Sequence, residues 1–198
     1  MNNKVISKKE KTRERILDKA AQVFSTKGYQ STSLTEIATT AGMKAGSLYY
    51  HFASKEVLMT EVLERNVDTI SDLVFDEIER LGENYLFKDG LEAFIKGHLT
   101  AVLKYPEYTK STIRNDGQIP NAVQKAAHAK RDHYEEQWRR LMTLGKDEGV
   151  IRPEIDEKLL RLMILGCLNW SCVWYSSGGD DIDTLADQYL NVFLNGCS

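Results

Sequence analysis

The residues best suited to a chemical task lie in the stretch 33–52, SLTEIATTAGMKAGSLYYHF. Hydroxyls, a lysine, a histidine and two tyrosines stand there beside a single acid, Glu36. This set suits hydrogen bonding to phosphates and base edges. Small residues around Gly46 would let a helix press closely against another molecule.

Two short helices joined by a tight turn must position these side chains. Ser33 followed by Glu36 fits a capping box, in which hydroxyl and carboxylate each satisfy a free backbone amide, so a helix is predicted over residues 34–40. Gly42 marks the turn, because glycine adopts positive φ at little cost. A second helix is predicted over residues 44–50. The pattern is that of a helix-turn-helix, which offers a helix to the DNA major groove.

Further helices are predicted on both sides of this motif. One covers residues 8–27 and is ended by Gly28, after a mobile arm over the first seven residues. A long one covers residues 55–81 and is capped by Ser54. The remaining apolar stripes recur at helical spacing and none alternates with period two. They predict helices near residues 88–103, 106–115, 120–148, 156–175 and 182–194. We therefore expect an all-α protein of about nine helices.

Charge is divided unevenly along the chain of 198 residues, whose net charge is −3. Residues 1–52 hold nine Lys/Arg against four Asp/Glu, a net charge of +5, which leaves −8 for the remainder. A basic head approaches phosphates while an acidic body avoids them. With 42% hydrophobic residues the chain can bury a sizeable core.

Several classes of protein are disfavoured. The N-terminus is charged and no apolar stretch follows it, so we expect no signal peptide. The most apolar run, 159–175, is broken by Arg161 and Asn169, which argues against a membrane span. Three cysteines without metal-ligand spacing suggest free thiols in a reducing cytoplasm. His128 and His133 lie about 140° apart around a helix and therefore not on one face, which argues against a shared metal ion. We expect no metal, no cofactor and no enzyme.

At this point the sequence resembles the TetR family of bacterial transcriptional regulators. The resemblance rests on residues 15–24 (RILDKAAQVF), 27–29 (KGY), 35–38 (TEIA), 41–42 (AG), 46–52 (GSLYYHF) and 54–58 (SKEVL). It implies a three-helix DNA-binding domain over residues 1–53. A helical effector-binding and dimerisation domain would follow over residues 54–198. The implied partners are double-stranded operator DNA, a small-molecule effector and a second copy of the chain.

The resemblance also implies which residues meet DNA. Base edges would be reached by Thr35, Lys44, Ala45, Gly46 and Ser47, and the backbone or flanking bases by Tyr49, Tyr50 and His51. One or two of these aromatics could instead pack inside.

Two further contacts come from the residues themselves. Lys55 lies in the first turn of a helix, whose free amides attract anions, and so predicts a phosphate contact, with a solvated lysine as the alternative. Ser33 could donate to phosphate or be occupied as a cap.

The effector pocket follows mainly from the resemblance. Its candidates are aromatic or polar residues of the central helices and a tryptophan near residue 175: Phe94, His98, Tyr108, Arg114, Gln118, Tyr134, Trp138 and Trp174. Each could equally fill a core. The stretch 169–175 with Gly178 and Gly179 resembles the subgroup that controls fatty-acid and sterol-ring degradation, whose members often bind acyl-CoA esters.

The last two predicted helices are the candidates for dimerisation. The first is apolar on most sides, so it must be covered on two faces. The predicted interface residues are Leu165, Leu168, Trp170, Leu185, Tyr189 and Val192. A dimer would present two heads to half-sites about 34–36 Å apart on DNA.

The sequence thus predicts a ligand-responsive transcriptional regulator, which we interpret as a repressor. One alternative is an architectural DNA-binding dimer without an effector. The other is a small helical enzyme, which would need clustered polar residues with perturbed pKa values. No motif supports that second alternative.

Overall fold

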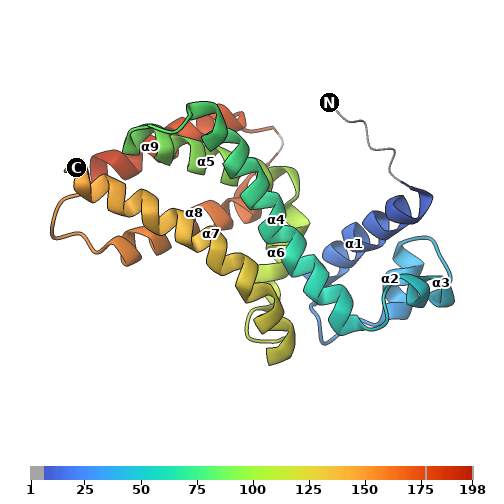
Figure 1. Ribbon diagram of the computed structural model, residues 1–198. Helices are drawn as coiled ribbons and strands as arrows, with labels where there is room; N and C mark the ends of the chain where they lie inside the picture. Colours follow the sequence, from blue (N-terminus) through green and yellow to red (C-terminus); the bar gives the residue numbers. More distant parts are fainter. Residues whose placement is uncertain (1–6, 177, 198) are drawn as a thin grey trace. The chain divides into compact units, whose positions relative to one another are not determined.

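The computed structural model describes residues 7–176 and 178–197, and every regular element in this part of the chain is a helix (Figure 1). The helices are α1 (Lys8–Lys27), α2 (Leu34–Thr40), α3 (Ala45–His51), α4 (Lys55–Leu81), α5 (Phe87–Lys104), α6 (Pro106–Asn115), α7 (Asn121–Asp147), α8 (Glu157–Trp174) and α9 (Ile182–Cys197). The expected all-α fold is confirmed. The predicted second short helix is displaced by one residue, because Lys44 is the N-cap of α3.

The chain forms two compact units. The N-terminal unit comprises Met1–Asn66 and Glu107–His128, and the C-terminal unit comprises Val67–Pro106 and Ala129–Ser198. The helix-turn-helix therefore packs with the start of α4, with α6 and with the start of α7. The predicted division into a DNA-binding domain over residues 1–53 and an effector-binding domain over residues 54–198 concerns function. Because the two units are defined by packing alone, that division stays a prediction.

Local sequence sets the helix ends, with two differences from expectation. A full capping box forms at α1, where Ser7 Oγ accepts from Glu10 N at 3.1 Å and Glu10 Oε2 accepts from Ser7 N at 2.7 Å. Most of the predicted arm lies outside the described residues, and Ser7 is this cap. At α2 only half of the predicted box forms. Ser33 caps Glu36 N at 3.2 Å, but the Glu36 carboxylate pairs with Lys27 instead.

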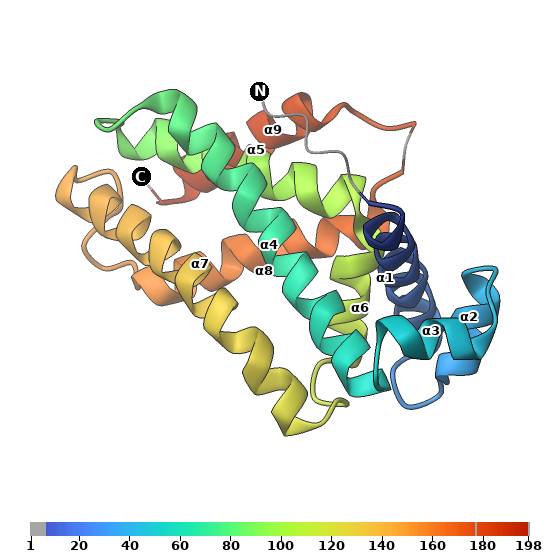
Figure 2. The ribbon, with the colours of Figure 1, turned by 45° about the vertical axis from the view of Figure 1, so that its right-hand side comes forward.

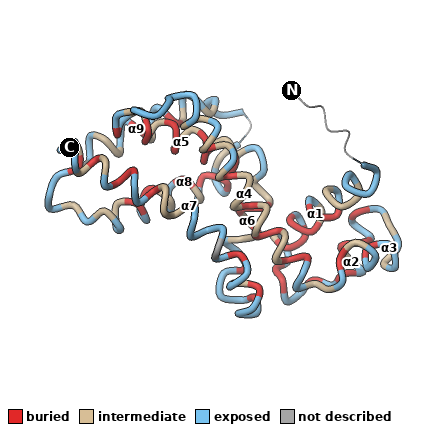
Figure 3. The backbone as a smooth tube through the Cα atoms, viewed as in Figure 1, coloured by how far each residue is buried: buried red, intermediate tan, exposed pale blue. Residues whose placement is uncertain are grey.

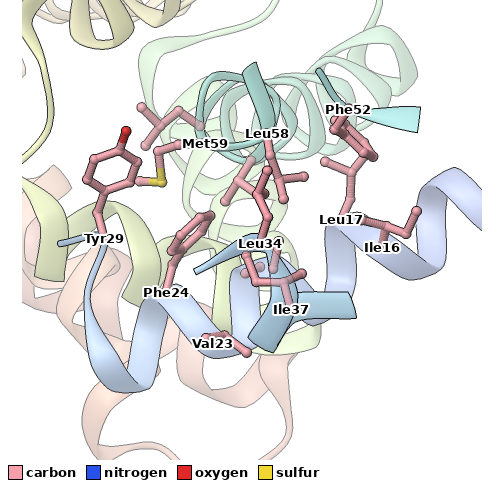
Figure 4. Close-up of a cluster of buried hydrophobic side chains, with 14 of the residues drawn as sticks. Ile16, Leu17, Val23, Phe24, Tyr29, Leu34, Ile37, Phe52, Leu58 and Met59 are labelled. Carbon is pink, nitrogen blue, oxygen red and sulfur yellow. The ribbon is translucent and has the colours of Figure 1, made fainter. Parts of the chain in front are cut away.

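Apolar side chains from α1, α2, α3 and α4 form the core of the N-terminal unit (Figure 4). Phe24, Ile37, Leu48 and Phe52 are fully buried there. Gly42 turns the chain between α2 and α3 with φ 67°, which allows Met43 N to donate to Ala38 O at 2.9 Å. Burying both short helices against α1 supplies the stability that helices of two turns lack alone.

The C-terminal unit is built around α5, which packs against α8 and α9 (Figure 2). Buried residues line α5 along most of its length (Figure 3). A Cβ on Gly97 would lie 2.6 Å from Val74 Cα, so this glycine permits a close approach of α5 to α4. Trp138 on α7 is fully buried in the same core.

Candidate nucleic-acid interface

The outer side of α3 carries polar and aromatic tips on a helix whose inner side is fixed. Leu48 is fully buried, whereas Gly46 and Ser47 are exposed, and Tyr49 and Tyr50 have exposed fractions of 53% and 73%. Hydrogen-bonding groups on one side of a helix and apolar anchors on the other are what a DNA-reading helix needs.

Four other predicted DNA contacts differ in how far their side chains are exposed to solvent. Thr35 on α2 and Lys44 before α3 are exposed, and Ala45 is half-buried against the core. Ser33 is exposed but its hydroxyl already caps α2, which favours the structural role over phosphate binding.

Arg13 on α1 binds the C-terminal end of α3, a role that the sequence analysis did not predict. Its guanidinium donates to His51 O at 2.7 Å, pairs with Glu61 on α4 and lies 4.2 Å from the centroid of the Phe52 ring. The sequence showed Arg13 only as one basic residue of the predicted helix 8–27, with no pattern that indicates its partners. This contact orients α3 from outside the helix.

Tyr50 and His51 form an edge-to-face pair with ring centroids 5.4 Å apart. The Lys9 ammonium lies 5.3 Å from the centroid of the Tyr50 ring, which brings the start of α1 beside the end of α3. His51 is half-buried, and its Nδ1 is buried without a hydrogen-bond partner. The positive charge of Lys9 on α1 therefore lies beside the exposed aromatic ring of Tyr50 at the end of α3.

Lys55 has an internal role that neither sequence interpretation foresaw. Its ammonium donates to Tyr29 O and to Thr32 O, both at 2.9 Å, and lies 4.3 Å from the centroid of the Tyr29 ring. It is not a solvated lysine. Two of its three N–H groups hold the loop between α1 and α2, so at most one is available for a phosphate.

Tyr29 completes this attachment from the other side. Its hydroxyl donates to Glu56 at 3.0 Å. Burial, with a smaller contribution from Glu56, raises the pKa of Tyr29 to about 12. The phenol therefore stays protonated and keeps donating at any physiological pH.

Asn115 at the end of α6 fixes the same loop. This fully buried amide accepts from Tyr29 N, and its Nδ2 donates to Phe24 O at 3.2 Å and to Ser111 O at 2.7 Å. In addition, the Tyr108 hydroxyl on α6 donates to Asp18 at 2.7 Å. The N-terminal unit thus holds its helix-turn-helix through α6 as well as through α4.

Comparison with known proteins identifies this arrangement. The model for bacterial regulatory proteins of the tetR family matches residues 16–62, and the model for the tetracyclin repressor-like C-terminal domain matches residues 87–197. The chain belongs to the TetR family. It is therefore a transcriptional regulator and not an enzyme. TetR regulators bind operator DNA and act as dimers.

Individual relatives match nearly the whole length of this TetR-family chain. The HTH-type transcriptional repressor KstR2 of Rhodococcus jostii is 30% identical over 191 residues, which cover 93% of this chain and 90% of the relative. The structure of the ketosteroid transcriptional regulator KstR2 of Mycobacterium tuberculosis matches with TM-score 0.78 and 25% identity, over 94% of each chain. The TetR-family regulator PfmR of Thermus thermophilus matches with TM-score 0.78 and 27% identity, over 94% of this chain and 97% of that one.

The predicted effector residues of this TetR-family chain fall into two groups. Phe94, His98, Tyr134 and Trp138 pack together in the C-terminal unit, where the Phe94 ring centroid lies 4.7 Å from that of Trp138. Trp174 is exposed.

The second group belongs to the N-terminal unit, where Tyr108 is buried and Arg114 and Gln118 are exposed. Tyr108 is bonded to Asp18, and burial raises the pKa of Tyr108. Gln118 is exposed and donates to Arg114 O at 3.0 Å, while Arg114 itself is exposed. The structure does not bring this group together with Phe94 and His98 in one unit.

The predicted dimer residues also divide. Leu168 is fully buried in the core of the C-terminal unit, so its side chain is not an interface residue. The sequence reading failed there because a helix that is apolar all round does not reveal which face is the core. Trp170 and Val192 are exposed, and Leu165, Leu185 and Tyr189 are half-buried.

An exposed apolar stripe on α8 extends this set. Its members lie three, four or seven residues apart and so share one face of the helix: Leu159, Leu162, Met163, Trp170, Val173 and Trp174. Large exposed apolar patches mark surfaces that contact a protein, a membrane or a ligand.

Other site types have no support in the described part of the chain. No group of three His, Cys, Asp or Glu side chains there could hold a metal ion. Among the described residues, none of the helices is both long and apolar enough to span a membrane.

Proposed function

We propose that this chain is a transcriptional repressor that binds operator DNA as a homodimer and releases it when a small hydrophobic effector binds. The exposed side of α3 carries the DNA half of the proposal. Ser47 and Lys44 are suited to base edges, and Tyr49 and Tyr50 to phosphates or flanking bases. Such a regulator works in the cytoplasm, where bacterial DNA lies.

The effector half is supported by the relatives. KstR2 of Rhodococcus jostii is named a repressor, and KstR2 of Mycobacterium tuberculosis is named a ketosteroid transcriptional regulator. We propose an acyl-CoA ester or another hydrophobic ligand as the effector class. To release DNA, the effector must favour the DNA-free form. A preference of about 100-fold corresponds to roughly 2.7 kcal/mol of coupling.

The homodimer is supported by the exposed stripe on α8. Trp170 and Met163 have exposed fractions of 55% and 66%, and Val192 on α9 has 65%. A second copy of the same pair of helices would cover these side chains and remove their apolar surface from water.

The experiment starts from DNA that the protein itself selects. Genomic fragments that the purified protein retains would define the operator, and fluorescence anisotropy would then measure its affinity. Ser47→Ala should change the preference between operator variants. Thr143→Ala, which removes an exposed hydroxyl on α7 that belongs neither to α3 nor to the proposed dimer surface, is the matched control and should change nothing. A uniform loss of affinity across all variants would contradict base reading by Ser47.

The effector is tested on the same complex with straight-chain and ring-containing acyl-CoA esters, with free coenzyme A as the control. Release by one ester supports the ligand-controlled repressor. Retention of DNA in the presence of every ester would overturn this effector class. It would also favour the architectural dimer that lacks an effector.

A further inference from the structure

A buried polar network crosses three helices of the C-terminal unit. His98 on α5 has an exposed fraction of 1%. Its Nδ1 lies 2.9 Å from the Tyr134 hydroxyl on α7, and its Nε2 lies 3.1 Å from Asn169 Oδ1 on α8. Phe94 and Trp138 pack beside it, with Phe94 at 6.4 Å from Tyr134 between ring centroids.

The amide oxygen of Asn169 fixes the direction of these hydrogen bonds. An oxygen of this kind only accepts, so His98 Nε2 carries the proton and Nδ1 carries the lone pair. The Tyr134 hydroxyl must then donate to Nδ1. The N–H groups of the Asn169 amide remain as donors at this end of the network.

Trp138 presents a second donor to the same core. Its side chain is fully buried, and its Nε1 has no hydrogen-bond partner. Tyr134 precedes it by one helical turn on α7. Burial raises the pKa of Tyr134, and a contact between the Trp138 indole N–H and the Tyr134 hydroxyl opposes that rise. That contact falls short of hydrogen-bond geometry, so the indole donor is incompletely satisfied. A buried donor without a good acceptor is destabilising, and an acceptor brought by a bound molecule would remove that penalty.

The charge of this network restricts what can bind. His98, Tyr134, Asn169 and Trp138 supply no positive charge, since burial lowers the pKa of His98 to about 4. A carboxylate moved from water into such surroundings would lose its hydration without gaining a counter-ion. A carbonyl oxygen accepts hydrogen bonds and carries no net charge.

We propose that Trp138 and the His98–Tyr134–Asn169 network recognise an uncharged carbonyl of the effector, such as a ketone, ester or thioester, and discriminate against a free carboxylate. This inference rests on the proposed function insofar as the bound molecule is the effector. It adds that Trp138 Nε1 donates to the carbonyl oxygen.

The indole proton of Trp138 reports this contact directly. The full-length protein labelled with nitrogen-15 tryptophan gives one indole resonance for each of its three tryptophans, and Trp138→Phe assigns the relevant one. Trp170, which is exposed and belongs to the proposed dimer surface rather than to the predicted effector residues, serves as the internal control. The probes are cyclohexanone, methylenecyclohexane and cyclohexanecarboxylate, which share a ring and differ in the acceptor.

Cyclohexanone alone should move the Trp138 indole proton downfield in a saturable titration. A shift caused by methylenecyclohexane would mean packing rather than hydrogen bonding, and one caused by cyclohexanecarboxylate would overturn the discrimination. No shift with any probe would overturn the site itself. None of these outcomes depends on DNA binding, so failure here is distinct from failure of the repressor function.

A second measurement uses DNA release by whichever carbonyl-containing ester proves active. Trp138→Phe should require about tenfold more ester for release, as expected for loss of one hydrogen bond of about 1.4 kcal/mol. DNA affinity without ester should match the wild type, which shows that the variant is folded. An unchanged ester requirement would contradict the proposal.

Discussion

Replacing His98 with Gln should remove a defined part of the pH dependence of stability. Burial lowers the pKa of His98 from 6.5 to about 4, and the hydrogen bond to Asn169 offsets only part of that effect. In the unfolded chain the pKa returns to about 6.5. Between these values the unfolded state binds a proton that the folded state does not.

The free energy of unfolding therefore falls as the pH is lowered through this window. The full contribution is present above about pH 6.5 and is lost progressively as the pH approaches about 4. A pKa difference of about 2.5 corresponds to about 3 kcal/mol per protomer, of which about 2 kcal/mol is lost by about pH 5. The side chain is fully buried, so solvent screening does not reduce this figure.

Urea unfolding at a series of pH values measures the effect, at one protein concentration because the stability of a dimer depends on it. His98→Gln keeps an acceptor for Tyr134 and a donor for Asn169 but cannot be protonated in this range. The difference between the two proteins should change by about 2 kcal/mol between about pH 7 and pH 5. His133→Gln, on an exposed part of α7, controls for removal of any histidine. Parallel curves for wild type and His98→Gln would refute the reasoning.

Three further substitutions test other parts of the structure. Lys55→Ala should lower the unfolding free energy by about 1.5–3 kcal/mol, because the amine donates to the Tyr29 and Thr32 carbonyls, and denaturant titration measures it. A loss of DNA affinity with unchanged stability would instead make it a phosphate contact. Asn115→Ala leaves Tyr29 N without its buried acceptor and should cost about 1–3 kcal/mol, visible as a lower Tm. An unchanged Tm would show that the loop does not need α6. Trp170→Glu should give monomers in sedimentation while Leu86→Glu, a comparably exposed site before α5, should not. Intact Trp170→Glu dimers would place the interface elsewhere.

Much of the fold was predictable because helix signals are local. Gly28 and Gly42 adopt positive φ where the chain has to leave a helix, and the bounds of α2, α4 and α6 agree with those expected. The order of motifs between residues 15 and 58 was enough to indicate the family that the comparisons confirm.

Side-chain partners were less predictable, because they come from distant parts of the chain. Glu36 follows Ser33 at the spacing of a capping box, yet its carboxylate forms an ion pair with Lys27. Lys55 begins a helix as a phosphate-binding lysine would, yet it donates to two carbonyls of the loop between α1 and α2. In both cases the local sequence predicted that the residue lies near the start of a helix. Its hydrogen-bond or ion-pair partner lies elsewhere in the sequence and became known only from the structure.

The sequence by itself determined the helices, their turns and the residues presented on α3, since periodicity, caps and glycines act within a few residues. Only the tertiary structure decided which face of α8 is core, burying Leu168 and exposing Trp170, because an apolar helix carries no signal that ranks its faces. Only it joined His98 to Tyr134 and Asn169 and left Trp138 Nε1 without an acceptor. Those contacts link residues 36 and 71 positions apart, and packing, not sequence spacing, brings such residues together.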